Sequence, residues 1–282
     1  MSRLRTVAFA AVLAGCASAE QARAELLSYE PFNYAAGTAV VGQGAGGSSG
    51  FLTPWAPGGF NASQSNNFLV GAGSLQHNNL ATTGGRLTSG PTNVISGITR
   101  DLAVPLGAAS TTRYVSFLVE PNAPLHQGAF NGFFGLTFES AGEPEFYVGK
   151  PGGGAIGNYV IENLGGNGQS VSNFLTTPGQ TALLVVKAEF TAAGADRMTL
   201  YVNPTPGMPE PTTASAFKGD ANFGSAHGLT VYSTGSFSLD EIRVGTTYAD
   251  VTPAVPEPAA VALAASVAAT FVRRRRPRIV RA

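Results

Sequence analysis

The chain of 282 residues has one cysteine, little charge and no long apolar run. Because Cys16 is that single cysteine, the sequence excludes an intrachain disulfide and a site built from several thiolates. Charged residues make up 12% of the sequence, about half the share of an ordinary soluble domain. Walker-type phosphate loops and Gly-x-Ser-x-Gly nucleophile elbows are also missing, which argues against the enzyme classes built on them.

Basic residues are scarce between residues 25 and 254. Eight Lys and Arg stand against fifteen Asp and Glu there, so this stretch carries a net charge of −7. Nucleic-acid binding needs clustered Lys and Arg, so we expect no nucleic-acid partner. The chain also holds 36 glycines and 18 prolines, which favours turns over long helices.

Residues that carry chemistry are sparse and show no familiar spacing. The histidines His77, His126 and His227 lie far apart and share no metal-ligand pattern. Glu143-Pro144-Glu145 lacks the Glu-x-Asp-x-x-Glu spacing of laminarinase-type glycosidases, which need two carboxylates across the sugar. We therefore predict no catalytic, cofactor-binding or metal-binding residue and a protein that is not an enzyme. The alternative is a secreted carbohydrate-active enzyme, a glycosidase or lyase, with an unrecognised site.

The first 24 residues have the order of a signal peptide. Residues 1–5 are basic, residues 6–15 are apolar, and Ala22-Arg23-Ala24 offers a small-x-small cleavage site. We expect cleavage after Ala24, with Ala22 and Ala24 as the recognised residues. Leu13-Ala14-Gly15-Cys16 also resembles a bacterial lipobox, in which Cys16 is lipidated and becomes the first residue. The two cleavage points remain open alternatives.

Residues 253–282 form a distinct tail. A Pro-Glu-Pro motif precedes the uncharged residues 259–272, and an arginine block follows. A stable membrane helix needs about 20 apolar residues, so this short segment predicts a transient transmembrane helix. The arginines favour the cytoplasmic side. The candidate sorting residues are Pro256, Glu257, Pro258, Arg273, Arg274, Arg275 and Arg276.

This tail resembles the PEP-CTERM sorting signal of Gram-negative and planctomycete-type bacteria. The resemblance implies processing by an exosortase-type membrane enzyme that cuts near the motif. It also implies an exported protein of the cell envelope, outer surface or extracellular matrix. An ordinary single-pass membrane anchor is the alternative.

Between the two ends, apolar and polar residues alternate with a period of two. The clearest such segments are residues 114–120, 133–139, 183–190 and 197–203. This alternation is typical of antiparallel strands with one buried face. We predict an all-β, two-sheet antiparallel jelly-roll sandwich as one domain over residues 25–252, with a signal helix before it and a short apolar helix after it.

The last predicted strand changes its buried parity. Phe237 and Leu239 share one face, whereas Ile242 and Val244 share the other. A one-residue slip turns the face over unless a bulge absorbs it, so we predict a bulge or bend near Asp240–Glu241.

Residues 236–251 (SFSLDEIRVGTTYADV) resemble the closing strand of laminin-G-like, concanavalin-type jelly rolls, and Glu30-Pro-Phe-Asn-Tyr resembles their opening strand. This resemblance implies a lectin-like sandwich. We therefore expect a non-enzymatic surface or matrix protein with extracellular polysaccharide as its candidate ligand. Aromatic rings that stack on sugars are the usual platforms, and the candidates are Trp55, Tyr147 and Tyr159.

Overall fold

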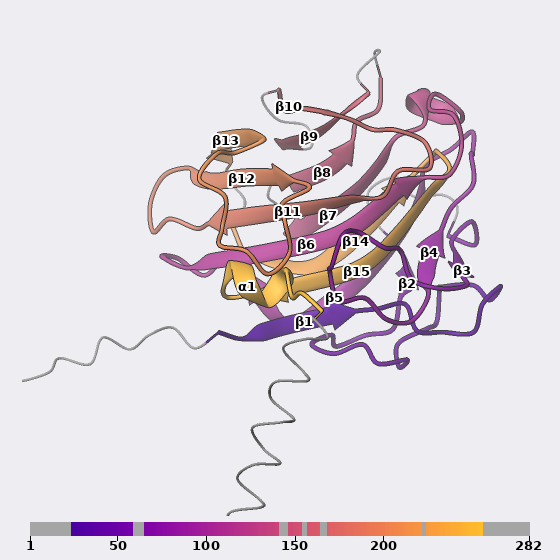
Figure 1. Cartoon of the computed structure of the whole chain (residues 1–282), viewed down its shortest axis with the longest axis horizontal. Coiled ribbons are helices and arrows are strands. Elements are labelled where there is room, and N and C mark those ends of the chain that lie inside the picture. Colours follow the sequence, from indigo (N-terminus) through magenta and orange to yellow (C-terminus); the bar gives the residue numbers. More distant parts are fainter. Residues whose placement is uncertain are drawn as a thin grey trace, which may run out of the picture.

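The computed structural model describes residues 24–58, 65–140, 146–153, 157–163, 168–221 and 224–255. Within these residues, fifteen strands form two antiparallel sheets that stack face to face (Figure 1). The prediction of an all-β, two-sheet sandwich is therefore confirmed. The predicted terminal helices, Cys16, Ala22 and the sorting residues lie outside the described residues.

Each sheet combines strands that are distant in sequence. The eight-stranded sheet has the order β13 (Ala216–Ala221), β12 (Asp196–Val202), β11 (Ala182–Glu189), β6 (Thr112–Pro121), β15 (Phe237–Gly245), β4 (Arg86–Thr88) and β3 (Leu69–Gly71), and β1 (Leu26–Glu30) also pairs with β15. The seven-stranded sheet has the order β10 (Gln169–Leu175), β9 (Asn158–Asn163), β8 (Phe146–Lys150), β7 (Phe134–Ser140), β14 (Ala226–Ser233), β5 (Ser96–Leu106) and β2 (Ala56–Pro57). The described helical segments are the single turns η1 (Ala129–Asn131) and α1 (Tyr248–Val251).

The four clearest predicted strands are β6, β7, β11 and β12, with ends within two residues of the prediction. Their inward residues meet in one core between the sheets, as the alternation requires. Phe117 and Leu184 come from the eight-stranded sheet, and Leu136 comes from the seven-stranded sheet. All three are fully buried.

The predicted bulge lies in β15. The pairing of β15 with β6 shifts register between Asp240 and Arg243, and Glu241 has a positive φ of 57°. The bulge lets residues of both parities enter the same core, since Leu239 and Ile242 both belong to it. This prediction is confirmed.

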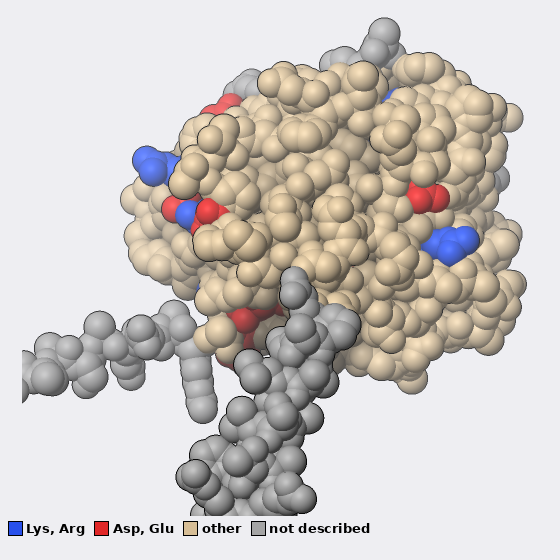
Figure 2. Space-filling view, in the orientation of Figure 1, with Lys and Arg blue, Asp and Glu red and all other residues tan. Residues whose placement is uncertain are grey.

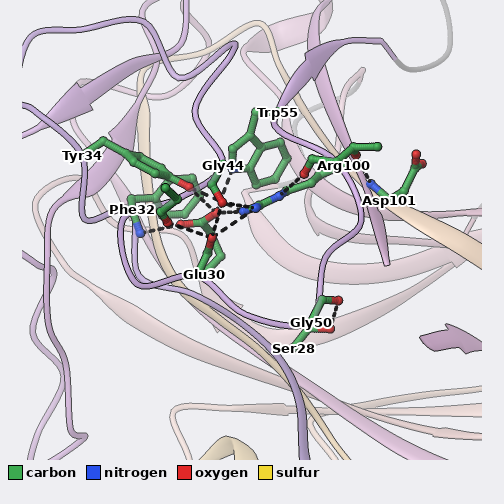
Figure 3. A network of polar contacts seen from close by, with 12 residues as sticks. Ser28, Glu30, Phe32, Tyr34, Gly44, Gly50, Trp55, Arg100 and Asp101 are labelled. Atoms are coloured by element: carbon green, nitrogen blue, oxygen red, sulfur yellow. Dashed lines mark hydrogen bonds and ion pairs between the residues drawn. The ribbon is translucent and has the colours of Figure 1, made fainter. Parts of the chain in front are cut away.

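A buried ion pair joins the two sheets. Glu30 of β1 and Arg100 of β5 point toward each other inside the fold (Figure 3). The Glu30 carboxylate also accepts hydrogen bonds from Trp55 Nε1 (3.0 Å), the Tyr34 hydroxyl (2.8 Å) and the Phe32 amide (2.8 Å). Burial raises the pKa of Glu30, whereas Arg100 opposes the rise. The donors compensate for the loss of water around this carboxylate.

The same arginine fastens the long segment between β1 and β2. Arg100 Nε donates to Thr53 O (2.7 Å), and its Nη2 donates to Gly44 O (2.8 Å) and Ser48 Oγ (3.1 Å). Its guanidinium also lies 4.2 Å from the centre of the Phe51 ring. A glycine-rich stretch with little apolar content is thus held onto the sandwich by this buried side chain, together with backbone hydrogen bonds such as those between Ser49 and Tyr29.

The outer face of the eight-stranded sheet is covered by chain. A second apolar cluster gathers there, from the sheet, the segment after β3 and α1: Leu75, Leu80, Tyr114, Leu118, Leu183, Val185, Tyr201, Tyr248 and Val251. Helix α1 is fixed by a reciprocal capping box between Thr247 and Asp250. The middle of this sheet is therefore buried on both faces.

On the side seen in Figure 2, charged side chains are few, and Lys and Arg do not form a basic patch. Among the described residues, none of the helices has the length and apolarity to cross a lipid bilayer.

Candidate functional site

The outer face of the seven-stranded sheet holds the polar side chains that could act on a ligand. In each strand, residues alternate between this face and the core. For example, Leu136 and Val231 lie in the core, whereas Thr137 and Tyr232 lie on the opposite face of the sheet. Not every side chain of this face is accessible, because Thr137, Tyr147, Thr230 and Tyr232 are themselves buried. We call the following set the open face: Thr99, Asp101, Gly135, Thr137, Glu139, Tyr147, Glu162, Gly228, Thr230 and Tyr232.

Two carboxylates of the open face flank one glycine. Gly228 of β14 pairs with Glu139 of β7 on one side and with Asp101 of β5 on the other. Asp101 Oδ1 lies 3.6 Å from the point where a Cβ on Gly228 would stand. The Cα atoms of the two acidic residues are two strand spacings apart, about 10 Å. Gly228 itself places no side chain between the two acidic residues.

Hydroxyl groups orient Glu139 across β14. Glu139 Oε2 lies 3.4 Å from Thr99 Oγ1 of β5, so its side chain reaches over the intervening strand. Thr99 Oγ1 in turn accepts a hydrogen bond from Thr230 Oγ1 at 3.0 Å. Asp101 is exposed and Glu139 is half-buried. The carboxylates are therefore closer together than their Cα atoms, and both reach solvent.

Strand β14 is irregular next to this pair. Ala226 pairs with Ser140 while Gly228 pairs with Glu139, so His227 is an extra residue between them. Bulges of this kind redirect side chains and are common beside active sites. His227 is exposed. In the described part of the chain, groups of three or more His, Cys, Asp or Glu able to hold a metal ion are absent.

A pocket of about 360 Å³ opens farther along the same face. Its lining consists of Ile95, Phe130, Phe133, Tyr147, Gly152, Gly153, Glu162 and Tyr232. Tyr147 and Glu162 are partners in the β8–β9 pairing. The Tyr147 ring covers Gly135, where a Cβ would stand only 1.9 Å from Tyr147 Cε2. An apolar, aromatic wall with one carboxyl group is typical of small-ligand sites.

The Glu162 carboxyl is the ionisable group of this pocket. Burial raises the pKa of Glu162, while Gln169 and Lys218 act in the opposite direction. The Glu162 carboxyl group lines the pocket and can accept a hydrogen bond from a ligand hydroxyl.

The three aromatic residues predicted to contact glycan are all inside the fold. Trp55 is 1% exposed, and Tyr147 and Tyr159 are each 2% exposed. Trp55 binds Glu30 through its indole nitrogen, and Tyr159 belongs to the main core. The prediction is wrong for these two residues because their burial leaves no ring face for a sugar. Tyr147 reaches the wall of the pocket.

The sequence prediction overlooked Glu139, Asp101 and Glu162. Glu139 and Glu162 stand at outward positions of their strands. This position in the alternating pattern was the sequence feature that could have marked them as candidates. Their partnership with Asp101 depends on strand pairing that the sequence does not display. The segment Glu143-Pro144-Glu145 lies outside the described residues.

No protein-family model matches the chain. No curated protein matches it either. Similar solved structures include the T. cruzi calreticulin globular domain, at 12% identity over 79% of this chain and 95% of that chain, with a TM-score of 0.46. An endo-β-1,4-glucuronan lyase from Trichoderma reesei is 11% identical over 71% of this chain and 97% of that chain, with a TM-score of 0.43. An endo-1,3-β-glucanase from Streptomyces sioyaensis is 12% identical over 81% of this chain and 98% of that chain, with a TM-score of 0.44.

These similarities concern the fold, and they assign no activity to this chain. They do correct the prediction that the protein is not an enzyme. A lyase and a glucanase are among the structures that resemble it, which contradicts that prediction.

Proposed function

We propose that the body is an exported carbohydrate-active enzyme that hydrolyses a neutral glycan on the open face. The observation that carries this proposal is the pair of carboxylates, Glu139 and Asp101, on either side of Gly228. Glycoside hydrolysis needs two carboxyl groups with a sugar between them.

The spacing of the pair suits an inverting reaction. In that reaction one carboxylic acid protonates the leaving oxygen while the other carboxylate activates a water molecule on the opposite side of the sugar. The two groups must stand about 6.5–9.5 Å apart to leave room for the water. The Cα atoms of the pair are about 10 Å apart, and Glu139 extends across β14 toward β5, which supports a carboxyl separation below that value.

The charge of the open face favours a neutral substrate. Its three charged side chains, Asp101, Glu139 and Glu162, are all acidic. Like charges repel most strongly where water is displaced, so uronate or sulfated chains would bind poorly. The aromatic pocket next to Glu162 offers a subsite for an uncharged sugar ring.

The test is hydrolysis of a panel of neutral polysaccharides, including β-1,3- and β-1,4-glucans, measured as released reducing ends. Glu139→Gln and Asp101→Asn should each lower the rate at least about 100-fold, the usual size of an acid–base contribution. Asp220→Asn is the matched control, because Asp220 is an exposed carboxylate on β13 of the other sheet. Added azide should restore turnover only in the variant that lacks the base. Unchanged rates in both variants would contradict the proposal.

Binding without turnover is the second candidate, and the aromatic pocket favours it. A binding protein would retain its affinity in Glu139→Gln and lose it when Tyr232 is replaced by alanine. A glycan array probed with both variants separates this outcome from hydrolysis.

We further propose that the protein is delivered by its two ends, a signal peptide and a PEP-CTERM tail cut by an exosortase-type enzyme. The Pro256-Glu257-Pro258 motif, the short apolar segment and Arg273 to Arg276 support this route. Alanine at all three motif positions should leave a longer, membrane-retained product. Export of an unchanged product would contradict the sorting role.

A further inference from the structure

The first residue after the predicted signal cleavage lies against two acceptors. The Glu25 backbone nitrogen is 3.0 Å from Thr246 Oγ1 and 3.1 Å from Asp250 Oδ2. The Glu25 carbonyl accepts a hydrogen bond from the Thr246 amide at 3.0 Å. Strand β1 begins at the next residue, Leu26, so Glu25 alone separates the predicted cleavage point from the sheet.

The Asp250 carboxylate is held in place by its own surroundings. Its Oδ2 accepts from the Thr246 amide (3.1 Å), the Thr247 amide (2.8 Å) and Thr246 Oγ1 (3.2 Å). These contacts belong to the start of α1 and do not involve β1. The acceptor is therefore preorganised for whatever group occupies the position of the Glu25 nitrogen.

A free amino terminus matches these acceptors better than a peptide amide does. The amide of Glu25 has one proton to share between two acceptors. Hydrolysis of the Ala24–Glu25 bond adds water across it and leaves a carboxylate on Ala24. The released amine of Glu25 takes up a proton and becomes an ammonium group with three donors. That group can bind Thr246 and Asp250 at once and gains charge attraction to Asp250.

We propose that Glu25 is the mature amino terminus, and that its ammonium group binds between Thr246 and Asp250 to fasten β1 onto β15 and α1. Cleavage at the lipobox is different, because residues after Cys16 would stay attached and Glu25 would keep its amide. The folded domain thus discriminates between the two predicted cleavage points.

The first experiment identifies the mature terminus. The full-length chain is expressed in an exporting Gram-negative bacterium, and the exported product is analysed by intact mass and amino-terminal sequencing. The expected product begins at unmodified Glu25. A product that begins at lipidated Cys16, or at any other residue, overturns the proposal.

The second experiment measures the reactivity of the terminal amine in that exported product. The rate of acylation at neutral pH should rise in Asp250→Asn, because an amine without its carboxylate partner is protonated to a smaller extent and the neutral amine is the reactive form. Asp220→Asn is the control and should react like the parent protein. Thr246→Val and Thr246→Ser form a second pair that leaves Asp250 intact, and only the valine variant should react faster. Equal rates in all variants overturn the proposed contact.

Discussion

Both sheets are built from strands with alternating residues, but their outer faces differ. The outer face of the eight-stranded sheet is sealed by an apolar cluster that includes Leu183, Val185 and Tyr248. The open face of the seven-stranded sheet instead carries Glu139 and Asp101 around a glycine, together with an aromatic pocket. The difference lies in the segments that follow the strands, since α1 and the chain after β3 cover one sheet.

The carboxylates on the two outer faces also differ. On the covered face, Glu210 accepts hydrogen bonds from the Tyr114 and Tyr201 hydroxyls at 2.7 Å each and pairs with Lys187 at 3.3 Å. Burial opposes its ionisation, but these partners hold the pKa of Glu210 below its usual value. Glu210 therefore fastens the loop between β12 and β13 to the sheet. Glu139 has a hydrogen bond from one hydroxyl, that of Thr99 at 3.4 Å, so its carboxylate can accept further hydrogen bonds from a ligand.

The largest expected contrast is in stability. Leu183→Ala on the covered face should lower the free energy of unfolding by about 2–5 kcal/mol, because it opens a cavity in a sealed cluster. Glu139→Gln on the open face should change it by less than about 1 kcal/mol. Denaturant unfolding of both variants measures the difference. Equal losses of unfolding free energy in the two variants would mean that the open face contributes to stability as much as the covered face does.

Asp240, which lies beneath the segment after β3, is expected to make the free energy of unfolding depend on pH. Burial raises the pKa of Asp240 to about 8, although Ser74 Oγ and the Leu75 amide donate to it. The folded state therefore binds this proton more tightly than the unfolded state does. Stability should fall as pH rises from about 4 to 8, by at most on the order of 1 kcal/mol per pH unit.

Asp240→Asn should flatten that slope while leaving the fold intact. Urea unfolding at several pH values between 4 and 8 measures it. A parent protein whose stability is constant over this range would show that Asp240 is ionised throughout.

Glu210→Gln tests the fastening role of the covered face. It should cost about 1–2 kcal/mol, since hydrogen bonds to a charged group are lost at a partly exposed position. Because the pKa of Glu210 is lowered, its contribution is present above the usual value and disappears as pH falls below it. The variant and the parent should thus converge in stability in acid, which thermal unfolding at low pH can show.

The smallest expected change in stability is at Gly228. A Cβ there would stand 3.3 Å from Arg100 O and 3.6 Å from Asp101 Oδ1, so alanine nearly fits. Gly228→Ala should alter stability by less than about 1 kcal/mol. The added methyl group would nevertheless fill the space between the carboxylates and suppress hydrolysis. Full activity in this variant would place the reacting sugar elsewhere.

Much of the fold was predictable from the sequence, whereas most of the site was not. Period-two alternation located β6, β7, β11 and β12, and the parity change before Ile242 located the bulge. Alternation reports which residues share a face, but it does not report which strands are neighbours. Glu139 and Asp101 meet only because β14 lies between β7 and β5.

The burial of Trp55 also could not be predicted from the sequence. Trp55 stands in a glycine-rich and proline-rich stretch that has the composition of a surface loop. Its burial depends on Glu30 and Arg100, which are distant in sequence and meet only in the folded sandwich.

Hydrogen–deuterium exchange with β-1,3- and β-1,4-glucan oligosaccharides tests the central claim most directly, because it locates the glycan without requiring turnover. The Glu139→Gln variant keeps the oligosaccharides intact during the measurement. Protection of the amides of β5, β7 and β14 is the predicted result. Protection confined to β11, β12 and α1, or no protection with any oligosaccharide, would contradict a glycan site on the open face.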